Sequence, residues 1–167
     1  LDSLCILYGK VGLNEAALTV GTKALAVRES SDVLKTVARA NKNLGKYNLA
    51  LQHYQKLLVA DSLNFEFLYE MAFCNINLSQ PSEAVTYLQK IIANPNSATA
   101  VMREFYQNGS QLVPYRAVAF NMLGFLQTQN GQDEDAFRSY QTSLSIYPNY
   151  ELAKNNLRIL EGKLAEN

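Results

Sequence analysis

The stretch Gly131-Gln132-Asp133-Glu134-Asp135-Ala136 shows the pattern that organises the chain, a glycine followed five residues later by an alanine. The alanine recurs as Ala17, Ala50, Ala84 and Ala136, at intervals of 50 − 17 = 33, 84 − 50 = 34 and 136 − 84 = 52 residues. The last interval equals a period of 34 residues plus an insertion of 18. Repetition at this length indicates one small helical unit copied along the chain, and it favours a binding surface over an active site.

Each unit is expected to contain two amphipathic helices joined by a short turn. In the second unit, apolar residues at helical spacing run from Val33 to Leu44, and a second stripe runs from Leu49 to Leu58. Gly45 should end the first helix, because glycine enters the left-handed region without a steric penalty from a Cβ atom. A turn of about three residues forces the two helices to pack antiparallel.

At these positions the sequence resembles the tetratricopeptide repeat. The third unit departs most from the family pattern, because Ser79 replaces the glycine of the turn. The first unit has Gly21 where the aromatic residue of the second helix is expected, which predicts looser packing there. The residues that carry the resemblance are Leu123, Gly124, Gly131, Ala136, Tyr140 and Pro148 in the fourth unit, Tyr8, Gly12 and Ala17 in the first, and Gly45, Ala50 and Tyr54 in the second.

The resemblance implies an all-α fold, namely a right-handed superhelical solenoid of antiparallel helix pairs that forms a single domain over residues 1–167. We expect a C-terminal capping helix at about 150–164, which would cover the apolar face of the fourth repeat. The insertion at about 97–113 could form a short helix ended by Asn108-Gly109-Ser110, or an ordered loop; it could belong to a binding face or be a tolerated decoration. The four repeats are predicted at about 1–30, 31–63, 64–96 and 114–149.

Composition and motifs exclude several classes of function. Lys plus Arg and Asp plus Glu number 15 each, and a chain without net positive charge is poorly suited to nucleic-acid phosphates. The sequence contains no apolar run long enough for a membrane span, and no motif of nucleotide binding, metal binding or nucleophilic catalysis. We predict buried, unpaired thiols for Cys5 and Cys74 and a solvated surface position for His53. The chain is therefore expected not to be an enzyme, and we predict no cofactor and no metal site.

The first helices of the repeats remain as the candidate site. In stacked helix pairs these helices line the concave side, where side chains that are not needed for packing can contact a partner. The predicted groove runs from a basic end, past an aromatic middle, to an amide-rich end, and would suit a protein or peptide with acidic and apolar residues. The candidate partner-binding residues are Lys35, Arg39, Tyr69, Phe73, Asn77, Asn121 and Phe125.

We therefore predict a non-catalytic scaffold or adaptor that binds a protein or peptide. One use of the family, clamping the C-terminal carboxylate of chaperones, matches poorly here, because Val118 and Met122 occupy the corresponding places of the fourth unit. Two alternatives stay open. One is a self-associating segment that forms a homo-oligomer through apolar residues between Leu1 and Leu7. The other is an interaction domain of a larger protein, which the absence of an initiator Met suggests.

Overall fold

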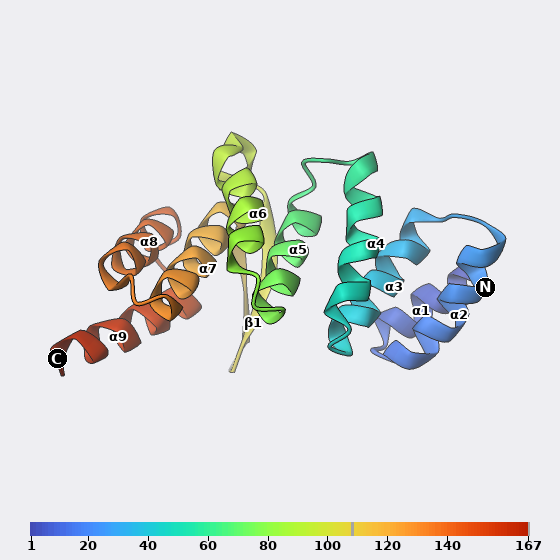
Figure 1. The fold of residues 1–167 in the computed structure, drawn as a ribbon, viewed down its shortest axis with the longest axis horizontal. Helices are drawn as coiled ribbons and strands as arrows, with labels where there is room; N and C mark the ends of the chain where they lie inside the picture. Colours follow the sequence, from blue (N-terminus) through green and yellow to red (C-terminus); the bar gives the residue numbers. More distant parts are fainter. Residues whose placement is uncertain (108, 167) are drawn as a thin grey trace. The chain divides into compact units, whose positions relative to one another are not determined.

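The computed structural model describes residues 1–107 and 109–166. The chain forms two compact parts, Leu1–Gln80 and Pro81–Asn167, each larger than one repeat; from here on they are called the first and the second unit. The first unit contains α1 (Asp2–Lys10), α2 (Asn14–Val27), α3 (Ser31–Asn43), α4 (Tyr47–Ala60) and α5 (Phe65–Asn77) (Figure 1). The second contains α6 (Pro81–Ala93), a short 3-10 helix η1 (Pro95–Ala98), β1 (Val101–Tyr106), β2 (Gly109–Pro114), α7 (Tyr115–Gln129), α8 (Asp133–Ile146) and α9 (Glu151–Ala165).

The residue that ends the first helix of each pair has the same backbone conformation in all four cases. Gly12, Gly45 and Gly131 have φ angles of 79°, 72° and 72°, which lie in the left-handed region that glycine enters without strain. Ser79 has φ 57° at the equivalent place, although it carries a Cβ atom. The predicted role of Gly45 is confirmed, and the turn, rather than the residue type, is what repeats.

Small residues mark the places where paired helices approach closely. The periodic alanines Ala17, Ala50, Ala84 and Ala136 are all fully buried. In the second unit Gly124 of α7 lies against the ring of Tyr140 on α8, and a Cβ added there would come within 2.7 Å of Tyr140 Cε1. Overpacking at such a contact destabilises a fold, which explains why these positions hold alanine or glycine.

The first helix pair packs tightly, so the looser packing predicted from Gly21 is wrong. A Cβ atom added to Gly21 would overlap Val37 Cγ2 and would lie 2.9 Å from Cys5 Sγ. Cys5, Val33 and Val37 form a buried cluster beside it. The absence of a side chain at Gly21 allows α3 and α1 to fill the space that an aromatic ring takes elsewhere.

The two cysteines are buried and unpaired, as predicted. Cys5 lies on α1 and Cys74 on α5, and both thiols are fully shielded from solvent. Burial raises the pKa of both thiols, that of Cys74 to about 12. Both side chains therefore act as small apolar groups of the core of the first unit.

The insertion folds as a β-hairpin after η1, so neither the short helix nor the ordered loop expected from the sequence is correct. Val101 pairs with Pro114 and Tyr106 pairs with Gly109 in an antiparallel ladder. From Val101 to Phe105, exposed and half-buried side chains alternate, which is the two-residue period of a strand. The dipeptide Asn108-Gly109 also favours a hairpin in the sequence; Gly109 begins β2 instead of ending a helix, and the part of the prediction that concerns Asn108 lies outside the described residues.

The helix α9 covers the last pair in the manner expected of a cap. Leu160 forms one buried cluster with Ala136 and Tyr140 of α8. The fold class is thus confirmed as antiparallel helix pairs of the solenoid type, with the hairpin as an addition. The boundary between the two units falls between the two helices of the third predicted repeat. Among the described residues, no helix combines the length and apolar character that crossing a membrane requires.

Candidate partner-binding site

Three cations form a stripe along one side of α3. Lys35, Arg39 and Lys42 follow one another at spacings of four and three residues, which places them on one helix face. Lys35 Nζ lies 2.6 Å from Glu66 Oε2, and Lys42 Nζ lies 2.7 Å from Glu70 Oε2. The first helices of the second and third predicted repeats are therefore joined by two ion pairs.

The two ion pairs differ in how well they are enclosed. The Lys42 and Glu70 side chains are only 18% and 11% exposed, whereas those of Lys35 and Glu66 are 37% and 39% exposed. Burial raises the pKa of Glu70, and the nearby charge and hydrogen bond of Lys42 oppose that rise. Removing one partner of the Lys42–Glu70 pair would leave an uncompensated buried charge, so this pair belongs to the scaffold.

Arg39 is the cation that remains available between these two ion pairs. It is half-buried and has no ion-pair partner among the described residues. The backbone of α1 approaches it at Gly9, where an added Cβ would lie 3.8 Å from an Arg39 guanidinium nitrogen. The predicted basic end of the groove is thus mostly neutralised by Glu66 and Glu70; the charge of Arg39 also acts on Glu70, but Arg39 forms no ion pair with a described residue.

The aromatic part of the site lies beside the enclosed ion pair. The Phe73 ring is half-buried, with Lys42 Nζ 5.3 Å from its centroid and the Tyr47 ring 6.3 Å away in an edge-to-face arrangement. Tyr69 is half-buried one turn earlier on α5. Asn77 is exposed and donates a hydrogen bond to the Phe73 carbonyl at 2.8 Å.

The other two candidate residues belong to the second unit, and only one of them is accessible. Phe125 on α7 is 41% exposed. Asn121 is 3% exposed, and its Oδ1 accepts a hydrogen bond of 2.9 Å from Asn156 of α9. The capping helix therefore occupies the amide of Asn121, which corrects the expectation that this residue faces a groove.

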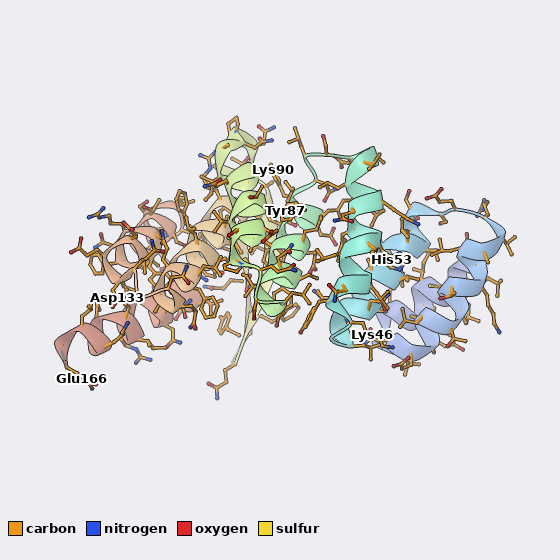
Figure 2. All side chains as sticks on the ribbon, viewed as in Figure 1. Lys46, His53, Tyr87, Lys90, Asp133 and Glu166 are labelled. Carbon is orange, nitrogen blue, oxygen red and sulfur yellow. The ribbon has the colours of Figure 1, made fainter. Side chains whose placement is uncertain are left out.

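Sequence reasoning missed a pocket of about 430 Å³ in the first unit, on the side where α4 meets α2 and α3. His53, labelled on α4 in Figure 2, contributes to its wall, and its Nδ1 atom is enclosed without a hydrogen-bond partner. Burial first, and then the charge of Lys56, lower the pKa of His53. His53 is thus half-buried, with one ring nitrogen enclosed, where the sequence analysis predicted a solvated side chain; the signal was its position three residues after Ala50 and four before Leu57. The lining residues are Thr22, Leu25, Glu29, Leu34, Val37, His53 and Lys56.

Comparison with known proteins identifies the repeat. A family model described as tetratricopeptide repeat matches residues 66–97. The structure of PilF from Pseudomonas aeruginosa superposes with a TM-score of 0.74 at 21% identity, over 99% of this chain and 68% of that one. Residues 66–97 are a tetratricopeptide repeat, and the chain has the fold of tetratricopeptide-repeat proteins. The family predicted from the glycine and alanine pattern is therefore confirmed.

Two further proteins are similar to parts of this chain. The first repeat domain of Spaghetti (RPAP3), solved with the HSP90 peptide SRMEEVD, superposes with a TM-score of 0.62 at 23% identity, over 81% of this chain and 93% of that one. The mouse protein O-mannosyl-transferase TMTC1 is 37% identical over 62 residues, which are 36% of this chain. The chain spans 6% of the length of that curated relative. Among the described residues of the repeat protein, no group of three or more His, Cys, Asp or Glu side chains could hold a metal ion.

Proposed function

We propose that the first unit binds an extended peptide or protein segment along the side that α3 and α5 form, without catalysing a reaction. A carboxylate of the partner would contact Arg39, and an apolar side chain would pack on Phe73 and Tyr69. The observation that carries this proposal is the pairing pattern of the α3 stripe. Lys35 and Lys42 are held by Glu66 and Glu70, so Arg39 is the cation left to pair with an anion from outside.

Two arguments support a peptide with mixed character. An Arg guanidinium forms bidentate bonds with a carboxylate, and such charge-assisted bonds are stronger than neutral ones. The half-buried Phe73 and Tyr69 offer apolar surface beside that charge, and the exposed amide of Asn77 can accept a backbone N–H. The repeat domain of Spaghetti, which has a similar fold, was solved with a peptide that combines acidic and apolar residues.

Binding to a panel of fluorescent peptides tests this proposal. The peptides would carry a Glu between apolar residues, and a matched set would carry Gln instead. We expect the Glu peptides to bind more tightly than the Gln peptides. We expect Arg39→Glu to weaken binding of the Glu peptides by at least about tenfold, because a repulsive carboxylate replaces the bidentate hydrogen bonds of the guanidinium. The binding of the Glu peptides to Arg39→Glu should also depend less on salt concentration than their binding to the parent.

The matched control is Lys46→Glu, which makes the same change of charge at an exposed lysine of the first unit. Lys46 is labelled in Figure 2 at the turn before α4, and its ion pair with Glu15 is long, at 3.4 Å. We expect this variant to bind as the parent does. Equal affinity of the parent for Glu and Gln peptides, or an Arg39→Glu variant that binds as well as the Lys46→Glu control, would refute the proposal.

Self-association is a second candidate function, and the exposed face of α1 favours it. Leu4 and Leu7 are 41% and 53% exposed and follow one another at helical spacing. Sedimentation of the parent and of a Leu4→Glu, Leu7→Glu variant tests this candidate. A mass that rises with concentration in the parent alone would support it, and a monomer at every concentration would exclude it.

A further inference from the structure

The β-hairpin of the second unit is firmly attached at its base. The Gln111 side chain donates a hydrogen bond to the Asn149 carbonyl at 2.5 Å and accepts one from the Glu151 backbone N–H at 3.1 Å. Val113 is fully buried, and the Tyr115 N–H donates to the Ala100 carbonyl at 2.9 Å. These contacts tie the hairpin to the connection between α8 and α9 and to the start of α7.

One face of the hairpin takes part in this attachment. Because side chains alternate along a strand, Glu104 and Gln111, which pair across the ladder, share the attached face. Burial raises the pKa of Glu104, and a hydrogen bond with Tyr150 opposes that rise. The attached face is therefore occupied by contacts within the unit.

The opposite face is apolar and exposed. Val101, Phe105 and Leu112 lie on it and are 48%, 76% and 50% exposed. Arg103 pairs with Leu112 across the ladder, so a cation lies among these apolar side chains. A cluster of exposed large apolar residues on a well-held element marks an interaction surface more strongly than scattered single residues do.

Arg103 has no ionic partner on this face. Its guanidinium donates to Ser110 Oγ at 3.0 Å, and it forms no ion pair with any described residue. The outer edges of β1 and β2 are open as well, since no backbone hydrogen bond joins the described residues of either strand to a third segment. Unpaired strand edges of this kind accept an added strand.

We propose that this outer face and a free edge of the hairpin bind an extended segment of another protein, which adds as a further strand. The segment would place a carboxylate against Arg103 and apolar side chains beside Phe105 and Leu112. Backbone hydrogen bonds along the edge would supply affinity, and the Arg103 contact would select the sequence. This site lies in the second unit and does not depend on the function proposed for α3 and α5.

Charge argues for a different chain rather than a second copy as the occupant. An antiparallel pairing of two β1 strands that brings their outer apolar residues together, with Val101 of one copy opposite Phe105 of the other, would also place Arg103 directly opposite Arg103. Like charges at directly opposed positions destabilise a ladder. A partner strand with Glu or Asp at that position converts the repulsion into an attractive pair.

The experiment uses the full chain and three blocked heptapeptides of alternating Val and Thr. The central residue is Glu in the first, Gln in the second and Pro in the third, because Pro cannot donate a ladder hydrogen bond. Amide shifts in NMR spectra locate the binding, and titration gives the affinity. We expect the Glu peptide to shift residues 101–106 and 109–114 and to bind at least about tenfold more tightly than the other two.

Two variants and their matched controls sharpen the test. Arg103→Gln should abolish the preference for Glu over Gln, and Phe105→Ser should weaken binding of the Glu peptide about tenfold. Arg138→Gln and Ile159→Ser change an exposed arginine and an exposed isoleucine of the same unit, and both should bind as the parent does. No binding of the Glu peptide, shifts confined to α3 and α5, equal effects of variants and controls, or a dimer that Phe105→Ser dissociates would each overturn the proposal.

Discussion

Two glycines inside helices of the second unit differ in what surrounds them. A Cβ added to Gly124 would lie 2.7 Å and 2.8 Å from two atoms of the Tyr140 ring, whereas nothing lies within 4 Å of one added to Gly162. We expect Gly124→Ala to lower the free energy of unfolding by about 1–3 kcal/mol through overpacking. Gly162→Ala should raise it by up to about 1 kcal/mol, because alanine favours the helix. Urea denaturation measures both, and a destabilisation of equal size in the two variants would contradict this explanation.

Ser79 adopts a backbone conformation that glycine favours, although it carries a side chain. Its φ angle of 57° lies in the left-handed region, where a Cβ atom costs about 1–2 kcal/mol. We therefore expect Ser79→Gly to raise the free energy of unfolding by about 1 kcal/mol, once the greater flexibility of glycine in the unfolded chain is allowed for. Gly45→Ala is the reverse change at the equivalent turn and should lower stability by a similar amount. A thermal midpoint that falls in Ser79→Gly would show that the serine side chain stabilises the turn.

His53 should make the stability of the first unit depend on pH. Burial lowers its pKa below the ordinary value of 6.5, so the folded chain holds the neutral form while the unfolded chain takes up a proton. Its contribution is fully present above pH 6.5 and is lost as the pH falls toward the folded-state pKa. We expect the free energy of unfolding to fall less between pH 7 and pH 5 in His53→Gln than in the parent. Parallel curves for the two proteins would contradict this.

At the scale of the element, Gln111 is expected to hold the hairpin in place. Gln111→Ala removes its hydrogen bonds to Asn149 and Glu151, each worth about 0.5–1.5 kcal/mol. Amides of β1 and β2 should then exchange with solvent about tenfold faster, while those of α7 keep their rates. Ser110→Ala is a suitable control, because it changes the hairpin without affecting these two bonds. Unchanged exchange in Gln111→Ala would mean that Val113 alone anchors the hairpin.

The sequence was sufficient to predict the helices but not the hairpin. The helices repeat buried positions every three or four residues, and a glycine marks the turn inside three of the four pairs, so the period predicts the pairs. The hairpin has one attached and one exposed face, and its alternation, which runs only from Val101 to Phe105, is too short to exclude a helix. The signal in the sequence is the Asn-Gly dipeptide at 108–109, which is common where two strands are joined; Gly109 begins β2 and pairs with Tyr106, and Asn108 lies outside the described residues.

The candidate site shows a similar limit. The faces on which Lys35 and Arg39 lie in α3, and Phe73 in α5, follow from the spacing of residues within each helix. Which cation meets which carboxylate depends on the register between α3 and α5, and Lys35–Glu66 and Lys42–Glu70 have separations of 31 and 28 residues. Likewise, the covering of Asn121 depends on where α9 docks. Contacts between elements thus decided which predicted residues remain available to a partner.

At the scale of the whole molecule, the two compact units should respond separately to a local defect. Leu160→Ala would empty part of the cluster that α9 forms with α8, at about 2–5 kcal/mol. Because repeats interact mainly with their neighbours, we expect faster amide exchange in α8 and α9 and unchanged rates in α1 and α2. The matched variant Val33→Ala in the first unit should give the reverse pattern. Uniform acceleration along the chain in either variant would indicate one cooperative unit instead.

The placement of the two thiols has a practical consequence. Cys5 and Cys74 both lie in the first unit, and the chain has no other cysteine. A thiolate forms only when these side chains reach solvent, so the rate of alkylation by a maleimide reports how often the first unit opens. Ser143→Cys, at a fully buried position of α8, would add a reporter for the second unit. Mass spectrometry of one alkylated sample of this variant would then measure the opening rates of both units at once, without any fluorescent label.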